Sequence, residues 1–175
     1  MSRLPRQLPL LLALLLIGCS DDGIDSVTLT DDEYPGGPAI VRLLPPRAVY
    51  HVGERVPIEI VIDEARDVAS VAFRLRYDPQ VLAFVPPAVE GPFLGSDGAN
   101  TVFLSSDTGS GGEIVVALSR MGAAEGASGA GTLAVFEFDA IAPGDCGFQF
   151  TGASVRDPQA RYLPSAFQTV EVRVE

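Results

Sequence analysis

His51, Cys19 and Cys146 carry the most reactive side chains of this 175-residue chain, which has one histidine and two cysteines. A Ser-His-Asp triad would have to use His51, which lies beside Tyr50 just before a turn at Gly53, and the sequence has no Gly-x-Ser-x-Gly elbow. A single histidine also cannot build a histidine-based metal cluster. These residues therefore predict neither a hydrolase triad nor a histidine metal centre.

The carboxylates show no catalytic arrangement either. Asp107-Thr108-Gly109 matches the triplet of aspartic proteases, but that chemistry needs two carboxylates that share a proton, and no second copy occurs. No opposed pair of Asp or Glu suits glycoside hydrolysis. We predict a non-enzymatic protein without a cofactor or metal. Calcium stays an alternative, because Asp97, Asn100 and Asp107 lie in predicted loops that could meet around an ion with many oxygen ligands.

The N-terminus has the layout of an export signal. Two arginines precede an apolar stretch from Leu8 to Ile17 that is too short to span a bilayer. The run ends in Leu16-Ile17-Gly18-Cys19, which resembles the bacterial lipobox and implies cleavage before Cys19 and lipidation of its thiol. We predict a lipoprotein signal peptide over residues 1–18, and an ordinary signal peptide with a chance cysteine is the alternative. Ser20 implies sorting to the outer membrane where the host has two membranes.

The remaining chain divides into a tether and one domain. Residues 19–38 are rich in Asp, Gly and Pro, which predicts an acidic flexible tether, and residues 39–175 suffice for one domain. Without residues 1–18 the chain keeps 10 arginines and 23 acidic residues, a net charge of −13. Such a surface repels nucleic acid and anionic lipids, so membrane contact is predicted through the lipid anchor only. With Cys19 lipidated, Cys146 has no intramolecular disulfide partner, and the fold must depend on its core.

From Ala39 onward, apolar residues recur with a period of two, which is typical of an antiparallel sandwich. One such strand runs from Val56 to Ile62, where Pro57 indicates an edge strand or a position whose missing donor faces outward. Another precedes Asp78-Pro79 and places Phe73 in the core. The Gly-rich stretch 122–131 predicts a mobile loop, either a passive connector or an adaptable binding loop. Further strands are predicted at residues 81–85, 101–105, 113–119, 132–141, 148–155 and 168–174.

Several motifs, in this order, resemble the cohesin domain family. Val52–Val56 resembles the glycine turn into its second strand, and Tyr77-Asp78-Pro79-Gln80-Val81-Leu82 is similar to its Tyr-Asp-Pro-x-x-Leu motif. Gly131–Phe138 is similar to its Gly-x-Leu-Ala-x-Ile-x-Phe strand, and residues 154–172 to its closing pair of strands. The resemblance covers residues 39–174. It implies an all-β, cohesin-like jelly-roll sandwich of nine strands or so, without a catalytic role.

The resemblance also implies a protein partner, since cohesins bind dockerin modules through one sheet face. Polar residues on the strand before Tyr-Asp-Pro commonly take part, and the family's usual Asn and Asp correspond here to Ser70 and Ala72. Where an acidic contact is usual near the end of a later strand, this chain has an arginine, and arginines favour an acidic or polar partner. The predicted partner-binding residues are Ser70, Ala72, Arg74, Arg76 and Arg120.

Two alternatives stay open. Arg74 and Arg76 could pair with Glu59 or Asp63 on a neighbouring strand, each pair contributing under about 1 kcal/mol when exposed. Carbohydrate binding is the other alternative, because some carbohydrate-binding modules share this sandwich fold and stack sugars on exposed aromatic rings. Our leading hypothesis is a non-catalytic, membrane-anchored interaction module with a dockerin-like partner, and polysaccharide is the alternative ligand. The chain lacks Trp, and its candidate sugar-binding aromatics are Tyr50, Tyr162 and Phe167.

Overall fold

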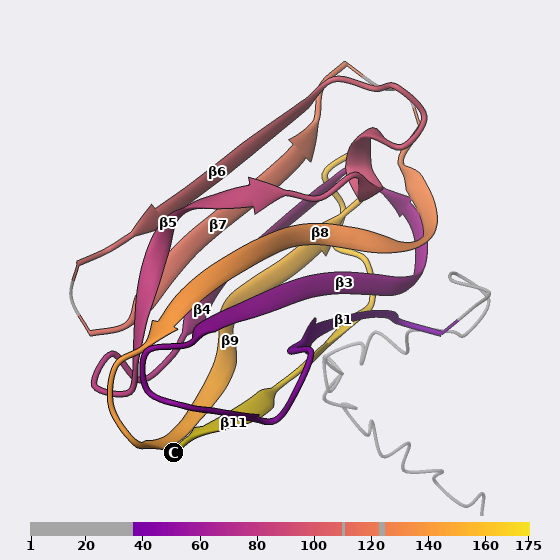
Figure 1. Cartoon of the computed structure of the whole chain (residues 1–175). Coiled ribbons are helices and arrows are strands. Elements are labelled where there is room, and N and C mark those ends of the chain that lie inside the picture. Colours follow the sequence, from indigo (N-terminus) through magenta and orange to yellow (C-terminus); the bar gives the residue numbers. More distant parts are fainter. Residues whose placement is uncertain (1–36, 110, 123–124) are drawn as a thin grey trace, which may run out of the picture. The chain divides into compact units, whose positions relative to one another are not determined.

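The alternating apolar pattern forms two β-sheets that face each other in the computed structural model of the chain (Figure 1). The structure describes residues 37–109, 111–122 and 125–175, which belong to one compact unit. The predicted signal peptide, Cys19 and nearly all of the predicted tether lie outside the described residues. The prediction of an all-β sandwich is confirmed for residues 39–175.

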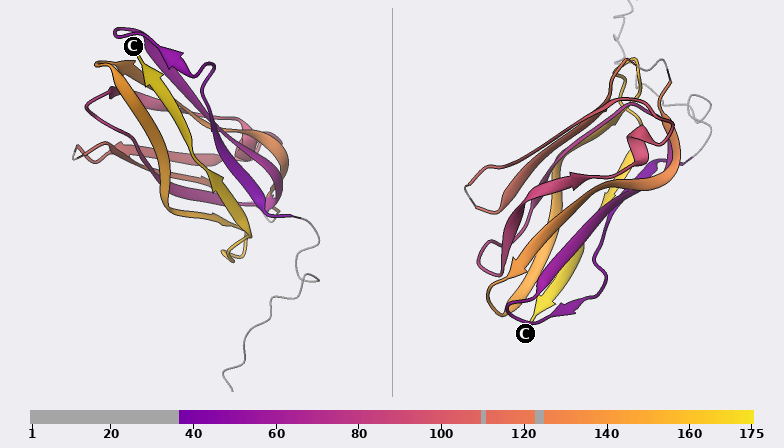
Figure 2. Two further views of the ribbon diagram at one scale, coloured as in Figure 1. Left: turned by 90° about the horizontal axis from the view of Figure 1, so that it is seen from below. Right: turned by 45° about the horizontal axis from the view of Figure 1, so that its top comes forward.

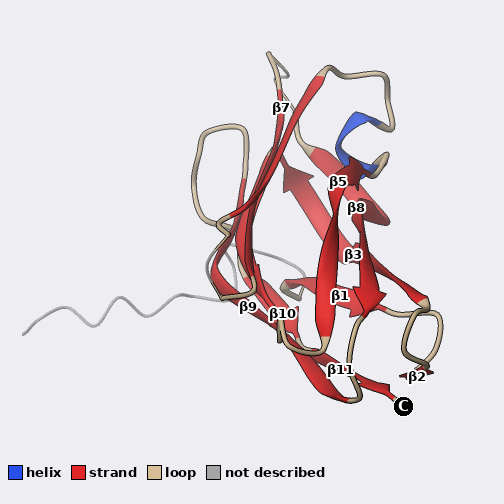
Figure 3. Cartoon of the chain, turned by 60° about the vertical axis from the view of Figure 1, so that its left-hand side comes forward, coloured by secondary structure: helices blue, strands red, loops and turns tan. Residues whose placement is uncertain are grey.

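Strands make up most of the described chain. They are β1 (Ala39–Leu44), β2 (Val49–Tyr50), β3 (Arg55–Val68), β4 (Ser70–Arg76), β5 (Leu82–Glu90), β6 (Thr101–Asp107), β7 (Glu113–Arg120), β8 (Ala127–Ala140), β9 (Gly144–Arg156), β10 (Ser165–Gln168) and β11 (Val170–Val174). A 3-10 turn, η2 (Phe93–Gly95), lies at one end of the sandwich (Figure 3). Within the described ranges no helix has the length and apolar character needed to cross a bilayer.

One sheet has five strands in the order β10-β1-β3-β8-β5, and the other has six in the order β2-β11-β9-β4-β7-β6. Figure 2 shows both layers from two further sides. Neighbouring strands are antiparallel, except that β1 with β10 and β2 with β11 are parallel. In the interior of the six-stranded sheet, β4 pairs with β7 on one side and with β9 on the other.

The core lies between the sheets and consists of every second residue of the long strands. On β3, the alternate residues from Val56 to Ile62 are fully buried, and on β4 Val71, Phe73 and Leu75 are buried. The Phe138 ring of β8 contacts the Phe148 ring of β9 in an edge geometry at 5.2 Å between centroids, which joins the two sheets. Burial of apolar area at about 25 cal/mol per Å² is therefore the main source of stability.

The Tyr77–Leu82 segment carries the chain from one sheet to the other. The Asp78 side chain accepts a hydrogen bond from the Gln80 N–H at 2.8 Å, and the backbone carbonyl of Asp78 accepts one from the Leu82 N–H at 3.0 Å. Tyr77 is buried and packs on Phe138 at 4.9 Å. The motif thus closes a tight turn with local hydrogen bonds and anchors it in the core.

Pro57 does not lie on an edge strand, so that alternative was wrong, whereas the other alternative, a position whose missing donor faces outward, agrees with the pairing. Its strand, β3, lies between β1 and β8. Pairing with β1 ends at Leu44 opposite Glu59, so at Pro57 the strand has β8 as its neighbour and no β1 residue on the other side. A proline is tolerated there because one side of the ladder has already ended.

The predicted loop at residues 122–131 was also wrong in its second half, because β8 already begins at Ala127. Gly126, just before this strand, serves close packing, because a Cβ there would lie 2.1 Å from the carbonyl carbon of Asp67. The predicted last strand, residues 168–174, is confirmed as β11, whereas β10 (Ser165–Gln168), which lies in the other sheet, was not predicted. Long-range pairing, rather than local composition, sets the ends of these strands.

Phe73→Ala is expected to lower the free energy of unfolding by about 3 to 5 kcal/mol, because the side chain is 2% exposed and its ring packs against Phe150 at 5.1 Å. Urea denaturation of the domain would measure this loss. Val89→Ala is the matched control, since Val89 is 60% exposed and should cost little. A loss below about 1 kcal/mol for Phe73→Ala would contradict its place in the core.

Candidate protein-docking face

The outer side of the six-stranded sheet presents aligned rows of side chains from β6, β7, β4 and β9. Ser70 pairs with Ser119 and Arg156, Ala72 with Ala117 and Ser154, and Arg74 with Val115 and Thr151. Residues directly opposite on neighbouring strands share one face. We call this surface the docking face, and it consists of Ser70, Ala72, Arg74, Arg76, Val102, Leu104, Ser106, Glu113, Val115, Ala117, Ser119, Gln149, Thr151, Ser154 and Arg156.

The docking face is apolar on its β6 and β7 side. Val102, Leu104 and Val115 are exposed large apolar residues, and Leu104 has 64% of its surface accessible. Leu104 pairs with Ala117, which in turn pairs with Ala72, so small side chains border it across two strands. An exposed apolar patch with a polar rim is typical of a protein interaction site.

Arg74 and Arg76 extend from β4 at one end of this patch. Their Nε atoms lie 3.8 Å and 3.7 Å from the two carboxylate oxygens of Glu113, beyond hydrogen-bonding distance. Such exposed pairs contribute under about 1 kcal/mol each. The predicted pairing with Glu59 or Asp63 was wrong, because both of those residues lie on β3 in the other sheet.

The docking face has the opposite charge to the chain as a whole. It holds three arginines, Arg74, Arg76 and Arg156, and one acidic residue, Glu113, a local net charge of +2. The whole chain carries −11. Complementary charge steers partners and selects among them, so this face favours a partner with carboxylates.

Arg120 was wrongly predicted to face a partner, because it lies on the inner side of β7 with Ile114, Val116 and Leu118. Its side chain is 4% exposed. The guanidinium donates to the Leu94 carbonyl at 2.6 Å and to the Asp97 carboxylate at 2.7 Å. Arg120 therefore holds the η2 segment against the end of the sandwich.

The alternative of calcium bound by Asp97, Asn100 and Asp107 was wrong. Asp97 precedes the start of β6, and Asp107 is its last residue, so the length of that strand, about 20 Å, separates them. Asp97 pairs with Arg120, and the Asp107 carboxylate accepts a hydrogen bond from Gly109 N–H at 2.9 Å. In the described ranges, no three His, Cys, Asp or Glu side chains come together as metal ligands would.

The three aromatics of the carbohydrate alternative do not form a platform. Tyr50 is 1% exposed, with Arg47 stacked on its ring at 4.5 Å. Phe167 is partly buried and packs on Phe150 at 5.3 Å. Their prediction as outward residues was wrong, because both side chains turn toward the core from the edge strands β2 and β10. Tyr162, by contrast, is 70% exposed, as predicted.

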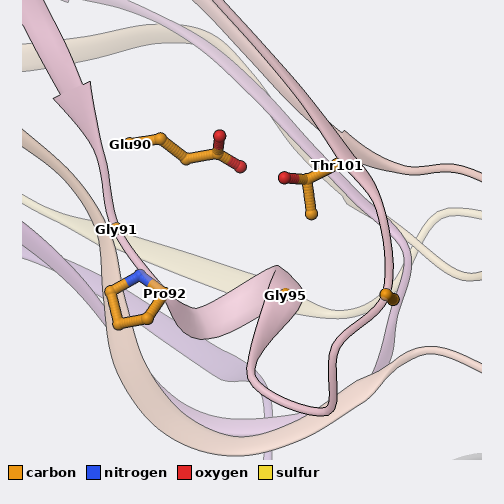
Figure 4. A pocket seen from close by; sticks show the side chains of 6 residues that line it. Glu90, Gly91, Pro92, Gly95 and Thr101 are labelled. Carbon is orange, nitrogen blue, oxygen red and sulfur yellow. The ribbon is translucent and has the colours of Figure 1, made fainter.

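A shallow hollow opens beside the η2 segment, between the end of β5 and the start of β6. It has a volume of about 360 Å³ and is lined by Glu90, Gly91, Pro92, Gly95, Ala99 and Thr101. The Glu90 carboxylate and the Thr101 hydroxyl point toward each other across it (Figure 4). Its two polar side chains give it hydrogen-bonding capacity but no nucleophile with an adjacent base.

Sequence reasoning missed the apolar part of the docking face: Val102, Leu104, Val115 and Ala117. A signal was present, because residues 114–118 are apolar without interruption. A strand with apolar residues on both faces is buried on both sides or offers one side to a partner. Since β7 covers the core with one face only, its outer Val115 and Ala117 remain open.

The comparisons with known proteins agree with this fold. The sequence matches the family model of the cohesin domain over residues 45–149, which is more than half of the chain. None of the curated proteins compared with the chain matches it significantly. The chain therefore belongs to the cohesin domain family.

Solved cohesin structures superimpose on most of the chain. A non-cellulosomal cohesin from the hyperthermophilic archaeon Archaeoglobus fulgidus is 19% identical, with a TM-score of 0.66 over 79% of this chain and 92% of that one. A type II cohesin module of an adaptor scaffoldin from Acetivibrio cellulolyticus is 18% identical, with a TM-score of 0.69 over 77% and 89%. A type II cohesin–X-dockerin complex of the same organism gives 16% identity and a TM-score of 0.65 over 78% and 99%.

Asp97→Ala is expected to destabilise the domain more than Arg120→Met. The first change leaves a buried guanidinium without its carboxylate, whereas the second removes the charge and keeps most of the apolar volume. Urea denaturation of both variants would measure the difference. Equal or reversed losses would show that the pair does not hold the η2 segment.

The same pair predicts an acid-dependent loss of stability. The hydrogen bond from Arg120 holds the pKa of Asp97 below its ordinary value. The contribution of this ion pair to the free energy of unfolding is therefore fully present above the pKa of Asp97 in the unfolded chain, near 4. It is lost as the pH falls through the lower pKa of Asp97 in the folded protein. Asp97→Ala should weaken the pH dependence of unfolding in this acidic range.

Proposed function

We propose that this protein is a non-catalytic docking module that binds a dockerin-like protein partner through the docking face. The observation that carries the proposal is the exposed apolar patch of Val102, Leu104 and Val115. Next to it lie Arg74 and Arg76, whose two positive charges share the single carboxylate of Glu113. A rigid sheet presents these groups without an ordering cost on binding, which favours affinity.

The family supports a protein partner. Among the structural relatives, one cohesin from Acetivibrio cellulolyticus was solved in complex with an X-dockerin. The positive docking face of this strongly acidic chain favours a dockerin that presents carboxylates. Ser70 and Ala72 belong to the same face and supply the close, flat contact that small side chains allow.

We further propose that the module is attached to the cell envelope, with Cys19 lipidated and the acidic segment 19–38 as its tether. The support is the lipobox-like Leu16-Ile17-Gly18-Cys19 after an apolar run. Several acyl chains, each contributing about 0.8 kcal/mol per buried methylene, hold a protein on a membrane stably. With Ser20 following, the outer membrane is the proposed location in a host with two membranes.

The docking proposal is tested by selecting binders of the folded domain from a displayed library of dockerin modules. Leu104→Asp and Arg74→Glu are each expected to weaken a selected dockerin at least about tenfold, since one places a charge in the apolar contact and the other repels the partner's carboxylates. Isothermal titration calorimetry would measure the affinities.

Matched controls lie on the other sheet. Val89→Asp changes a 60% exposed valine of β5, and Arg42→Glu an exposed arginine of β1, and both should leave dockerin affinity unchanged. Leu104→Asp, Arg74→Glu and Val89→Asp should unfold at nearly the wild-type temperature, whereas Arg42→Glu should unfold at a somewhat lower temperature because it removes the ion pair with Asp63. Equal effects of face and control variants, or the absence of any dockerin binder, would overturn the proposal.

Cys19→Ser is expected to move the protein from the membrane fraction to the soluble fraction or to leave an uncleaved precursor, because the acylated thiol is lost. Fractionation of cells followed by mass spectrometry of the N-terminus would show either result. Cys146→Ser is the control and should leave membrane attachment intact. Recovery of the wild-type protein in the soluble fraction rather than the membrane fraction would contradict the lipid anchor at Cys19.

A further inference from the structure

Tyr162 extends the docking face beyond β9. It forms an isolated antiparallel bridge with Arg156, which pairs with Ser70 of β4, which pairs with Ser119 of β7. Ser119 pairs in turn with Val102 of β6. Directly opposed residues share a face, so one continuous row runs from Val102 of β6 across β7, β4 and β9 to Tyr162.

Arg156 holds the Tyr162 ring on this face. Its guanidinium carbon lies 4.1 Å from the ring centroid, and its Nη2 donates a hydrogen bond to the Tyr162 hydroxyl at 2.6 Å. Its Nη1 also approaches the Ala160 carbonyl at 3.4 Å. A ring held in this way loses little rotamer freedom when a partner covers it, which lowers the cost of binding.

Tyr162 and Leu104 are the two most exposed large hydrophobic residues of the described chain, at 70% and 64%. They lie at opposite edges of the same face, Leu104 on β6 and Tyr162 past β9. Four strand-to-strand steps lead from β6, which holds Leu104, to the segment of Tyr162, a width of about 19 Å at about 4.8 Å per step. Arg74 and Arg76 lie on β4 between the two edges.

We infer that Tyr162, stacked on Arg156, is a second anchor for the protein partner, at the opposite edge from Leu104. This inference rests on the proposed docking function and defines the partner further. The partner spans about 19 Å across the strands, covers both apolar anchors, and places carboxylates between them over Arg74 and Arg76. Aromatic side chains and arginines are the residue types that most often dominate binding at such contacts.

A photo-crosslinking experiment tests this geometry in the full chain within its native envelope. A benzoyl-phenylalanine is introduced at position 104, at position 162 or, as a control, at position 89 on the other sheet. We expect positions 104 and 162 to crosslink the same polypeptide, identified by its peptide masses, and position 89 not to do so. The identified partner is then purified as the probe for binding measurements.

With that probe, Tyr162→Ala is expected to weaken binding about tenfold, and Tyr162→Phe to stay close to wild type, since the ring is kept. Arg156→Ala should weaken binding in the same direction, because it releases the ring and removes a charge. Leu104→Ala combined with Tyr162→Ala should show nearly additive losses, as expected for anchors far apart. Thermal unfolding of each variant verifies that the fold is retained.

Any other result of the crosslinking or binding measurements contradicts a stated part of the docking geometry. Crosslinking from position 104 alone, or unchanged affinity in Tyr162→Ala, overturns the second anchor and leaves the docking function standing. Crosslinking from neither position overturns both, and crosslinking from position 162 alone overturns the Leu104-centred face. Titration with cellohexaose that is abolished by Tyr162→Ala would assign this ring to carbohydrate instead and would overturn the inference.

Discussion

The register of β4 between β7 and β9 is the constraint on which the structure and its proposed function depend. Because side chains alternate along a strand, the pairing that buries Val71, Phe73 and Leu75 necessarily turns Arg74 and Arg76 outward. A shift by one residue would exchange the two sets, placing guanidinium groups in the core. The large cost of that exchange protects the position of the outward residues, so the stability of the core also specifies the docking face.

The same alternation of side chains along a strand turns Arg120 toward the core. It lies on β7 at a core-facing position, and its charge is tolerated because it occurs where the strand ends. There the guanidinium reaches the Leu94 carbonyl and the Asp97 carboxylate, which is exposed and also accepts a hydrogen bond from Ala99 N–H. A buried charge requires such partners, so Arg120 is a structural residue of the η2 segment and unavailable to a ligand.

The fold suits binding better than catalysis. The described residues form two packed sheets, and short ion pairs such as Arg42 with Asp63 and Arg55 with Asp139 lie on the other sheet from the docking face. The face itself keeps exposed apolar side chains and two arginines that share one distant carboxylate. These groups make few contacts within the domain, so a partner can satisfy them without disturbing the core.

The sequence by itself determined the all-β class, the core position of Phe73 and the outward position of Arg74 and Arg76, because a period of two in hydrophobicity is a local property of a strand. The Tyr77–Leu82 motif likewise identified the family before any contact was known. Only the tertiary structure decided that Tyr50 and Phe167 are covered, that Arg120 is buried, and that Tyr162 shares a face with Leu104. Those facts depend on which strands become neighbours and where pairing ends, and long-range pairing energies set both.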